Sequence, residues 1–551
     1  MSEKQMECVE VSAAITRRSL FGAAAVLGLG SVAALAGCAP ASKDAAGPAK
    51  SETSDAADAS AADAAPTTWD VEETVDVLVA GSGTAGTCAA VRAAELGAKV
   101  LCLEKLSFLG GTSSGAEWMS GVNNSFQVAA GLECDPAEPF RDVMAYGSWG
   151  PISEVLWEFV NKSADTIQWM QDCGVQFTEG NYALLDIMPE LKYSVAGQIN
   201  GGYGRNGETI LEPLRAFGEQ FGENLEFRIE CPVTHLVIED DKVTGAFAQD
   251  KDGKVIKVNA KSVILATGGF CNNEEYYEKY MNRPYGDVVF YGFEGRDGDA
   301  LRMTAPLNPR LQAPACMNYA MGCIEGTKGF DEEVNVWFAW NPLLYIDSHG
   351  NRFMDEGLAV SMDASLRNIS IMTAGRCYAI ADENTVAAWD ALGPFDTGTG
   401  MTEGNLMESI KNCSGVTVAD TLDELAAAIN VDAANLKAAA EQWNAIGKGE
   451  ADPVYQTAPE TAAAAPVTTG PFYAAQLRAS AYGTGGGLAT NKEFRVITQD
   501  MQPIEGLFAI GTDNGSCYYR DYPMTAFAAF QQGFCATGGR LAAEAAVGKT
   551  A

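Results

Sequence analysis

A glycine-rich turn between an apolar strand and a helix constrains the fold of this chain more than any other feature. Residues 75–80 are almost continuously apolar, which is typical of a strand buried in a parallel sheet. The turn after them reads Gly81-Ser82-Gly83-Thr84-Ala85-Gly86 and opens an alanine-rich helix expected over 87–96. A second apolar strand, 99–103, ends at Glu104, 23 residues after Gly81. This order predicts a Rossmann-type βαβ unit that binds a dinucleotide.

Each residue of this turn has a physical role in holding a dinucleotide. Gly81 permits the tight turn, Gly83 lets the backbone reach the pyrophosphate, and Gly86 allows close helix packing. Thr84 and Ala85 are also predicted to contact the cofactor, and the N-terminus of the helix that follows stabilises phosphate charge. Glu104 is expected to accept hydrogen bonds from the adenosine ribose hydroxyls.

A second glycine and hydroxyl loop distinguishes a flavin from a nicotinamide cofactor. Lys105 leads into this loop, where the predicted cofactor contacts are Gly110, Gly111, Thr112, Ser113 and Gly115. Backbone amides and small hydroxyls of this kind suit the ribityl chain and ring of an extended flavin. Two later segments fit the same cofactor: one contains Ala266, Thr267 and Gly268, and the other ends at Asp513, a candidate ligand of the ribityl hydroxyls. We therefore predict non-covalently bound FAD.

The first 70 residues read as an export signal and a tether. Arg17 and Arg18 precede an uncharged stretch that runs to Ala36, which resembles a twin-arginine signal. The stretch ends in Leu35-Ala36-Gly37-Cys38, which resembles a lipoprotein cleavage site with Cys38 as the lipidated residue. The alternative, a transmembrane anchor, suits this Gly- and Ala-rich stretch less well. We expect a protein exported by the twin-arginine route and lipid-anchored at the extracytoplasmic face of the cell membrane, with residues 39–70 as a disordered linker.

Composition excludes several classes of function. The 551 residues include 37 Lys and Arg against 72 Asp and Glu, a formal charge of −35. Such a surface disfavours nucleic acid as a partner. The sequence has no CxxC pair and no CxxCH segment, so neither an iron–sulfur cluster nor attached haem is expected, and no metal site is predicted.

The rest of the chain predicts an α/β protein. Short strands at 233–238, 243–249 and 255–258 suggest a small antiparallel meander, and 263–266 reads as a further buried strand. Helical periodicity covers 421–446, with Thr421 and Asp432 as expected N-caps.

These motifs, in this order, resemble the flavoprotein family that contains soluble fumarate reductase, urocanate reductase and 3-ketosteroid delta-1-dehydrogenase. Gly350-Asn351-Arg352-Phe353-Met354-Asp355-Glu356 is similar to the family's GxRFxxE segment, and Gly485-Gly486-Gly487 adds to the likeness, which covers about residues 72–548. The resemblance implies a flavin domain interrupted by an α+β substrate-capping domain. We expect FAD-binding parts at 71–311 and 483–551, a cap at 312–482, a signal at 1–38 and a linker at 39–70.

The departures from the family argue against fumarate as the substrate. Val360 stands about where the fumarate enzymes have their acid arginine, Tyr482 or Gly483 where they have a histidine, and Tyr522 where they have an arginine clamp. A phenol offers one donor and no charge, so it cannot replace a guanidinium that grips a carboxylate. Tyr522-Pro523 is instead similar to the Tyr-Pro segment of ketosteroid dehydrogenases, although Met524 follows in place of the expected glycine.

The predicted catalytic residues are Tyr522, Tyr482 and Arg520. The competing interpretation, a tyrosine that only fills the core, weighs equally for Tyr482 and Tyr319. For Arg352, the competing interpretation is a structural role in which its guanidinium binds the Glu356 carboxylate. The leading hypothesis is reduction of an activated C=C bond in an enone or aromatic acrylate-like small molecule. Electrons would come from a separate donor, a membrane or lipoprotein cytochrome. The alternatives are a dehydrogenase that introduces unsaturation and a non-catalytic electron relay.

Overall fold

The computed structural model describes residues 64–116, 118–179, 182, 185, 189–199, 202–203, 208–327, 332–361, 363–392 and 406–549. These residues belong to the unit Ala59–Ala551. The predicted signal, Cys38 and most of the predicted linker lie outside the described residues. Within the described part of the chain, no helix is both long and apolar enough to span a membrane.

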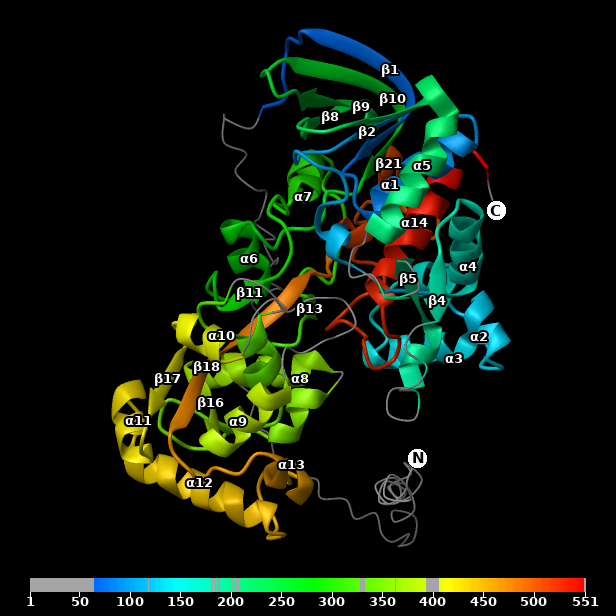
Figure 1. Cartoon of the computed structure of the whole chain (residues 1–551). Coiled ribbons are helices and arrows are strands. Elements are labelled where there is room, and N and C mark those ends of the chain that lie inside the picture. The colour runs from blue at the N-terminus through cyan, green and yellow to red at the C-terminus, as the bar shows by residue number, and fades with distance from the viewer. Residues whose placement is uncertain are drawn as a thin grey trace, which may run out of the picture. The chain divides into compact units, whose positions relative to one another are not determined.

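The first sheet is built around the predicted βαβ unit (Figure 1). Strand β1 pairs in parallel with β10 on one side and with β2 on the other, and Ala80 faces both Leu265 and Leu103. The three strands therefore end together at one edge of the sheet. The strands in order are β20 (Arg495–Ile497), β21 (Pro503–Ala509), β10 (Val255–Leu265), β1 (Val71–Ala80), β2 (Val100–Leu103) and β7 (Leu225–Arg228).

Strand β10 is continuous where the sequence suggested two strands. Its first half, residues 255–259, pairs antiparallel with β9 (Lys242–Gln249), which also pairs with β8 (Val233–Glu239). Its last residues, 263–265, pair in parallel with β21. Burial alternates in the first half and is complete in the second. The apolar pattern changes within β10 because its two halves have different surroundings. For this reason the sequence pattern predicted two strands instead of one.

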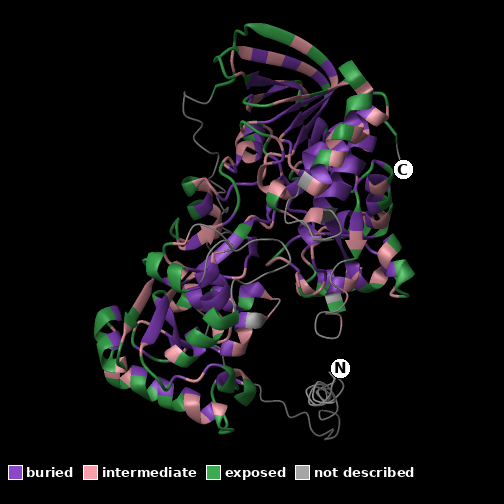
Figure 2. Ribbon diagram, in the orientation of Figure 1, coloured by how far each residue is buried: buried purple, intermediate pink, exposed green. Residues whose placement is uncertain are grey.

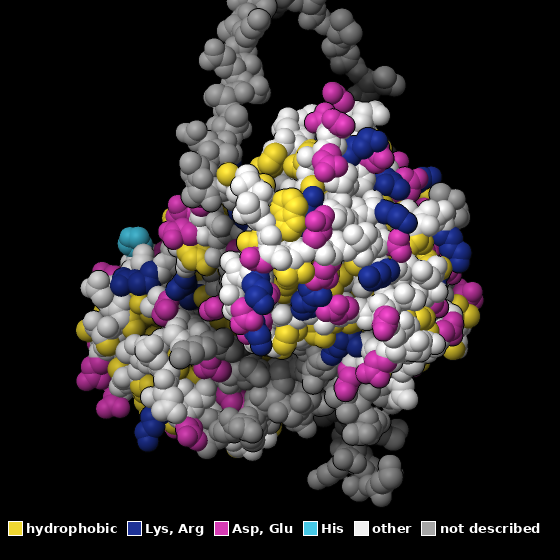
Figure 3. All heavy atoms as spheres, turned by 90° about the horizontal axis from the view of Figure 1, so that it is seen from above, with side chains coloured by type: hydrophobic (Ala, Val, Ile, Leu, Met, Phe, Trp, Pro, Cys, Tyr) yellow, Lys and Arg dark blue, Asp and Glu magenta, His cyan; other side chains and the backbone are white. Residues whose placement is uncertain are grey.

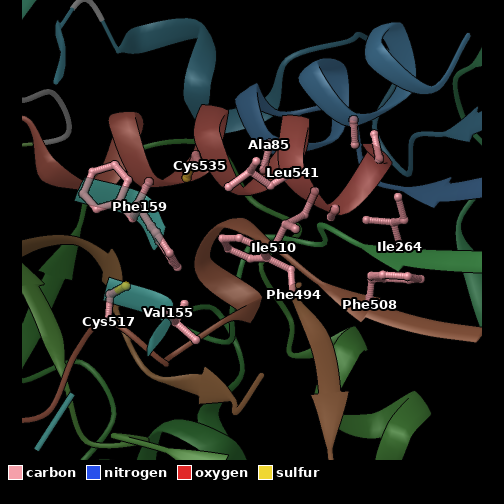
Figure 4. Packing of buried hydrophobic residues seen from close by; sticks show 14 of the residues in the cluster. Ala85, Val155, Phe159, Ile264, Phe494, Phe508, Ile510, Cys517, Cys535 and Leu541 are labelled. Carbon is pink, nitrogen blue, oxygen red and sulfur yellow. The ribbon is translucent and has the colours of Figure 1, made fainter. Parts of the chain in front are cut away.

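Two helices cover one face of the first sheet at very close range. Helix α1 (Thr84–Glu95) packs against α14 (Phe530–Ala546), and both are almost wholly buried (Figure 2). A Cβ on Gly539 would lie 2.3 Å from the carbonyl oxygen of Ala85, so the helices meet where glycine leaves room. Around them lies an apolar cluster that contains Phe159, Phe494 and Phe508 (Figure 4).

The second sheet is organised around one long strand, β18 (Phe472–Thr484). Its neighbours are β11 (Val288–Phe290), β13 (Met317–Tyr319), β14 (Cys323–Ile324), β16 (Cys377–Asp382) and β17 (Val416–Ala419), and β15 (Leu344–Ile346) pairs with β16. Most of these strands lie within the predicted cap, although β11 comes from the preceding segment. The domain boundaries stay a prediction.

The remaining elements connect and flank the two sheets. The smaller strands are β3 (Trp118–Ser120), β4 (Phe177–Glu179), β5 (Ser194–Ile199), β6 (Gly202–Tyr203), β12 (Leu311–Gln312) and β19 (Gly487–Leu488). The remaining helices are α2 (Ser125–Ala129), α3 (Ala137–Tyr146), α4 (Ser153–Asp172), α5 (Glu208–Gly218), α6 (Glu274–Met281), α7 (Asp299–Thr304), α8 (Ala364–Ala374), α9 (Glu383–Leu392), α10 (Leu406–Asn412), α11 (Leu422–Ile429), α12 (Ala433–Gly447) and α13 (Pro459–Ala464). The side chains of Thr421 and Asp432 cap α11 and α12, as expected from the sequence.

The exterior mixes both signs of charge. On the face in Figure 3, Lys and Arg side chains lie among Asp and Glu side chains. The large negative net charge therefore does not form one continuous acidic patch on this face.

Candidate functional site

The glycine turn lies at the edge where β1, β2 and β10 end. Gly81 has φ +100°, and a Cβ there would lie 2.2 Å from the carbonyl oxygen of Ala266. A Cβ on Gly86 would lie 1.9 Å from the carbonyl oxygen of Gly81. Thr84, Ala85 and Gly86 form the first turn of α1. Glycine at positions 81 and 86 is therefore required by backbone contact, and the helix N-terminus faces the strand ends.

Glu104 follows β2 and fastens this turn. Its carboxylate accepts hydrogen bonds from the amide of Ser82 (2.9 Å), the hydroxyl of Ser82 (2.6 Å) and the amide of Leu106 (2.9 Å). The side chain is buried, yet each carboxylate oxygen can accept more than one hydrogen bond. The hydrogen bond from Glu104 to a ribose stays a prediction. The structure adds a second role, because Glu104 also holds the glycine turn in shape.

The second loop folds onto the first. The amide of Gly110, which has φ +103°, donates to the Ser82 hydroxyl at 3.0 Å, and the Ser113 hydroxyl accepts from the amide of Thr84 at 3.0 Å. Gly111–Gly115 form a short helix, and the space where a Cβ would stand is open at both Gly111 and Gly115. Thr112 instead packs against Gly292.

Lys105 lies beside the loop but turns its charge elsewhere. Its ammonium group is paired with Asp297 and with Asp299, the latter at 2.9 Å. Burial works to lower the pKa of Lys105, but the two carboxylates outweigh burial and raise it. In this arrangement Lys105 joins the loop to the start of α7, and its charge is neutralised by protein.

Asp513 and Thr267 meet on the other side of the glycine turn. The Asp513 carboxylate accepts from the amide and hydroxyl of Thr267 and from the amide of Gly269 at 3.0 Å. Burial raises the pKa of Asp513 to about 6, although these hydrogen bonds oppose the shift. Gly268 has φ +100° and rests on the side chain of Arg296.

The predicted cofactor residues therefore line one continuous edge. The glycine turn, the second loop, the Ala266-Thr267-Gly268 segment and Asp513 all follow the ends of strands β1, β2, β10 and β21. Open space beside the glycines of the second loop and a helix N-terminus with small residues fit an extended dinucleotide.

Tyr522 is held by the N-terminal end of α14. Its hydroxyl oxygen accepts a hydrogen bond from the amide of Gln531 at 3.1 Å, and its ring stacks on Tyr518. The phenol hydrogen is still able to donate to another group. Burial raises the pKa of Tyr522, and the nearby Tyr482 raises it further, so the phenol stays protonated at neutral pH.

Tyr482 lies on β18, and its backbone is tied to the segment that contains Gly268. Its carbonyl oxygen accepts from the guanidinium of Arg296, the same side chain that supports Gly268. The side chain is 37% exposed, which distinguishes it from the buried Tyr319 on β13. The charge of the Tyr482 phenolate would act on Tyr522, because Tyr482 raises the pKa of Tyr522.

Arg520 does not join this pair and lies at the surface. Its guanidinium donates to the Ser148 hydroxyl at 3.3 Å. Ser148 and Trp149 both have positive φ, +54° and +62°, and Trp149 is 64% exposed. The exposed ring of Tyr519 packs on the following residue, Gly150. Consecutive left-handed residues without glycine cost energy and are concentrated at functional sites. Sequence reasoning missed this loop because Ser-Trp carries no turn signature.

Arg352 of the GxRFxxE segment is structural in this fold. Its guanidinium binds both carboxylate oxygens of Glu356, at 2.7 and 2.6 Å, and Asp452 at 2.8 Å. All three side chains are buried. Burial raises the pKa of Glu356, with Arg352 opposing the shift. The interpretation of Arg352 as the partner of Glu356 is confirmed.

Sequence reasoning also missed a carboxylate pair. Asp363, the N-cap of α8, accepts a hydrogen bond from the Tyr146 hydroxyl at 3.1 Å. Burial raises the pKa of Asp521, and the negative charge of Asp363 raises it further. No motif marks these residues, because they come from three distant segments.

Comparison with known proteins identifies relatives across most of the chain. The model of the FAD binding domain family matches residues 76–525. Vinyl phenol reductase of Lactiplantibacillus plantarum is 26% identical and covers 82% of this chain and 93% of the relative. Digoxin reductase of Eggerthella lenta is 28% identical over 92% of each chain. In fold, the chain is similar to 3-ketosteroid delta1-dehydrogenase of Sterolibacterium denitrificans, with a TM-score of 0.70 at 20% identity over 87% of this chain and 100% of that one.

Proposed function

Because the chain belongs to the FAD binding domain family and is an FAD-dependent oxidoreductase, we propose that it reduces an activated carbon–carbon double bond in a small enone or aromatic acrylate-like compound. Relatives named for vinyl phenol and digoxin support a non-fumarate substrate. The absence of a guanidinium at position 522 supports the same exclusion. The single observation that carries the proposal is the Tyr522 hydroxyl, whose oxygen is held by the amide of Gln531 while its hydrogen can donate to a substrate.

The chain's own residues would hold the cofactor at the strand ends. The first turn of α1 would stabilise the pyrophosphate, Glu104 would bind the ribose, and Asp513 would bind the ribityl hydroxyls. FAD bound there would supply the hydride that a double-bond reduction requires.

Tyr522 is proposed to donate a hydrogen bond to the activating carbonyl of the substrate. Its oxygen is fixed by the amide of Gln531, so the hydroxyl hydrogen is free to point at another acceptor. A hydroxyl held in place stabilises the negative charge that develops on the carbonyl oxygen as hydride arrives. Because its pKa is raised, the phenol keeps its proton throughout the neutral range.

Purified protein without residues 1–38 gives the direct test. It should release intact FAD on acid denaturation, and after reduction by viologen it should be reoxidised by a compound from a panel of enones and unsaturated aromatics. Tyr522→Phe should lower kcat about a hundredfold with little change in FAD content or KM. A Tyr522→Phe protein with wild-type kcat would contradict the assignment of Tyr522. Reoxidation by protein partners alone would favour an electron relay.

The setting of the reaction is a second part of the proposal. Export by the twin-arginine route and a lipid anchor at Cys38 would separate the enzyme from cytoplasmic nicotinamide cofactors, so a membrane or lipoprotein cytochrome would supply electrons for respiratory use of the substrate. The support is the Arg17-Arg18 pair and the Leu35-Ala36-Gly37-Cys38 segment. Cys38→Ala should abolish lipid labelling, whereas changing both arginines to lysine should leave precursor in the cytoplasm.

A further inference from the structure

Strand β18 has a single exposed residue, and that residue is aromatic. The other residues of β18 are buried or half-buried, whereas the side chain of Tyr482 is exposed. A tyrosine that only filled the core would be buried together with its strand. The exposed ring therefore needs another explanation, and the pairing of the strand supplies one.

The pairing of β18 with β13 is irregular at Tyr482. Asn318 on β13 pairs with Gly483. The next residue of β13, Tyr319, pairs with Ala481, so the register between the two strands skips Tyr482. One extra residue on one strand is a β-bulge, which bends the strand and changes the direction in which a side chain points. The bulge thus takes Tyr482 out of the regular alternation of the two faces of the sheet.

The guanidinium of Arg296 holds the backbone of this bulge. It donates to the carbonyl oxygen of Tyr482, and a Cβ on Gly483 would lie 3.4 Å from its Nη1 atom. Its Nε atom donates to the side-chain oxygen of Asn272 and to the carbonyl oxygen of Phe293, both at 3.1 Å. Arg296 is buried, and these three acceptors are neutral oxygens. The directions of the hydrogen bonds, more than charge, therefore fix this side chain.

Arg296 also connects the bulge with two of the predicted cofactor segments. A Cβ on Gly268 would lie 3.2 Å from Cγ of Arg296, so the aliphatic stem lies against the backbone of the Ala266-Thr267-Gly268 segment. The amide of Phe293, whose carbonyl oxygen Arg296 binds, donates to the Thr112 hydroxyl of the second glycine loop at 3.3 Å. One buried side chain therefore joins both cofactor segments to the strand that carries Tyr482.

We propose that Arg296 is a positioning residue that holds the bulge against the cofactor segments, so that the exposed Tyr482 side chain contacts the substrate beside the flavin. The inference rests on the proposed reductase function. Tyr482 is the residue that touches the substrate, and Arg296 acts through it. This arrangement accounts for an exposed aromatic ring on an otherwise buried strand, and it makes the place of that ring depend on the hydrogen bonds of one guanidinium.

Arg296→Met separates this positioning role from packing. Methionine keeps an unbranched apolar stem against Gly268 but lacks the guanidinium donors. Flavin content should therefore stay near the wild-type value, whereas kcat/KM with vinyl phenol should fall about tenfold, as expected within one hydrogen-bond network. Arg296→Lys can still donate to the carbonyl oxygen of Tyr482 and should recover part of the loss.

A double-mutant cycle tests whether Arg296 acts through Tyr482. Tyr482→Ala should itself lower kcat/KM. Adding Arg296→Met to Tyr482→Ala should cause no further loss, because the side chain that Arg296 positions is then absent. Arg376→Met is the matched control, since exposed Arg376 also donates to a backbone carbonyl oxygen, that of Asn430, at 3.1 Å. It should leave kcat/KM unchanged in both backgrounds.

A second readout needs no substrate. In holoenzyme that contains fluorotyrosine, the fluorine NMR signal of Tyr482 is identified by its loss in Tyr482→Phe. This signal should shift or broaden in Arg296→Met, because the carbonyl oxygen of Tyr482 loses its donor there. It should stay in place in Arg376→Met.

Two results would overturn the assignment. One is an Arg296→Met protein with wild-type kcat/KM, or with a loss that is equally large in the Tyr482→Ala background. The other is an unchanged fluorine signal of Tyr482 in Arg296→Met. If vinyl phenol and every compound of the panel fail to reoxidise the wild-type holoenzyme, the reductase function itself is wrong. The fluorine signal then still decides whether Arg296 positions Tyr482.

Discussion

Asp513 accepts hydrogen bonds from both the amide and the hydroxyl of Thr267, a residue 246 positions earlier in the chain. The contact fixes the segment after β10 to the segment after β21. Because those strands are parallel neighbours, their ends lie together, and one buried carboxylate can serve both loops. Burial at this junction raises the pKa of Asp513, and the shift has measurable consequences.

The stability of the flavin-free protein should fall as pH rises through the range set by Asp513. Its folded pKa, about 6, lies above the ordinary value of 3.8, so the folded state binds more protons between these values. Stability from this group is complete below about pH 4 and is lost as pH rises through 6, at up to about 1.4 kcal/mol per pH unit. Urea unfolding at a series of pH values should show this slope in the wild type and a smaller slope in Asp513→Asn. Equal slopes would contradict the assignment.

Gly81→Ala should abolish FAD binding. The main reason is a steric clash of the new Cβ, which adds to the strain of a positive φ. The new Cβ would lie 2.2 Å from the backbone oxygen of Ala266, which cannot move without displacing β10. Gly97→Ala is the matched control, because Gly97 has φ +91° but nothing within 4 Å of a new Cβ. We expect Gly97→Ala to cost about 1–2 kcal/mol of stability and to keep its FAD. Flavin absorbance of both variants measures the bound FAD, and urea unfolding measures the loss of stability. Retention of FAD by Gly81→Ala would be incompatible with this geometry.

Glu104→Ala should weaken FAD binding by roughly 1.5–3 kcal/mol, the value of a charge-assisted hydrogen bond. Glu104→Gln should lose less, because an amide oxygen can still accept from Ser82 and keep the turn in shape. Glu226→Ala, on the neighbouring strand β7 and exposed, is the control. Fluorescence titration with FAD measures all three. Wild-type affinity in Glu104→Ala would mean that Glu104 is not the ribose ligand.

Arg352→Met should destabilise the protein by about 3–5 kcal/mol, because it leaves Glu356 and Asp452 buried without their partner. Arg228→Met removes two partly exposed ion pairs, with Glu73 and with Glu226, and each pair should contribute about 0.2–1 kcal/mol. The comparison of the two unfolding free energies separates a buried network from a surface pair. Equal effects would refute the structural role of Arg352.

The sequence by itself determined the features that depend on neighbours in the chain. Apolar runs and the glycine spacing from Gly81 to Gly86 predicted the βαβ unit, because a strand, a tight turn and a helix each follow from local backbone preferences. Thr421 and Asp432 were identifiable as N-caps for the same reason, since a cap bonds an amide two or three residues away. The class of cofactor followed from the second glycine loop.

Only the tertiary structure decided which distant side chains meet. Lys105 turns to Asp297 and Asp299, and the Tyr146 hydroxyl donates to Asp363, although no local pattern connects any of these residues. Strand β10 is likewise continuous because different partners pair with its two halves. Such contacts are set by how the sheets and loops pack, which brings together segments that are far apart in the chain. Charge and burial then give each group the pKa and partners that its own sequence neighbours do not specify.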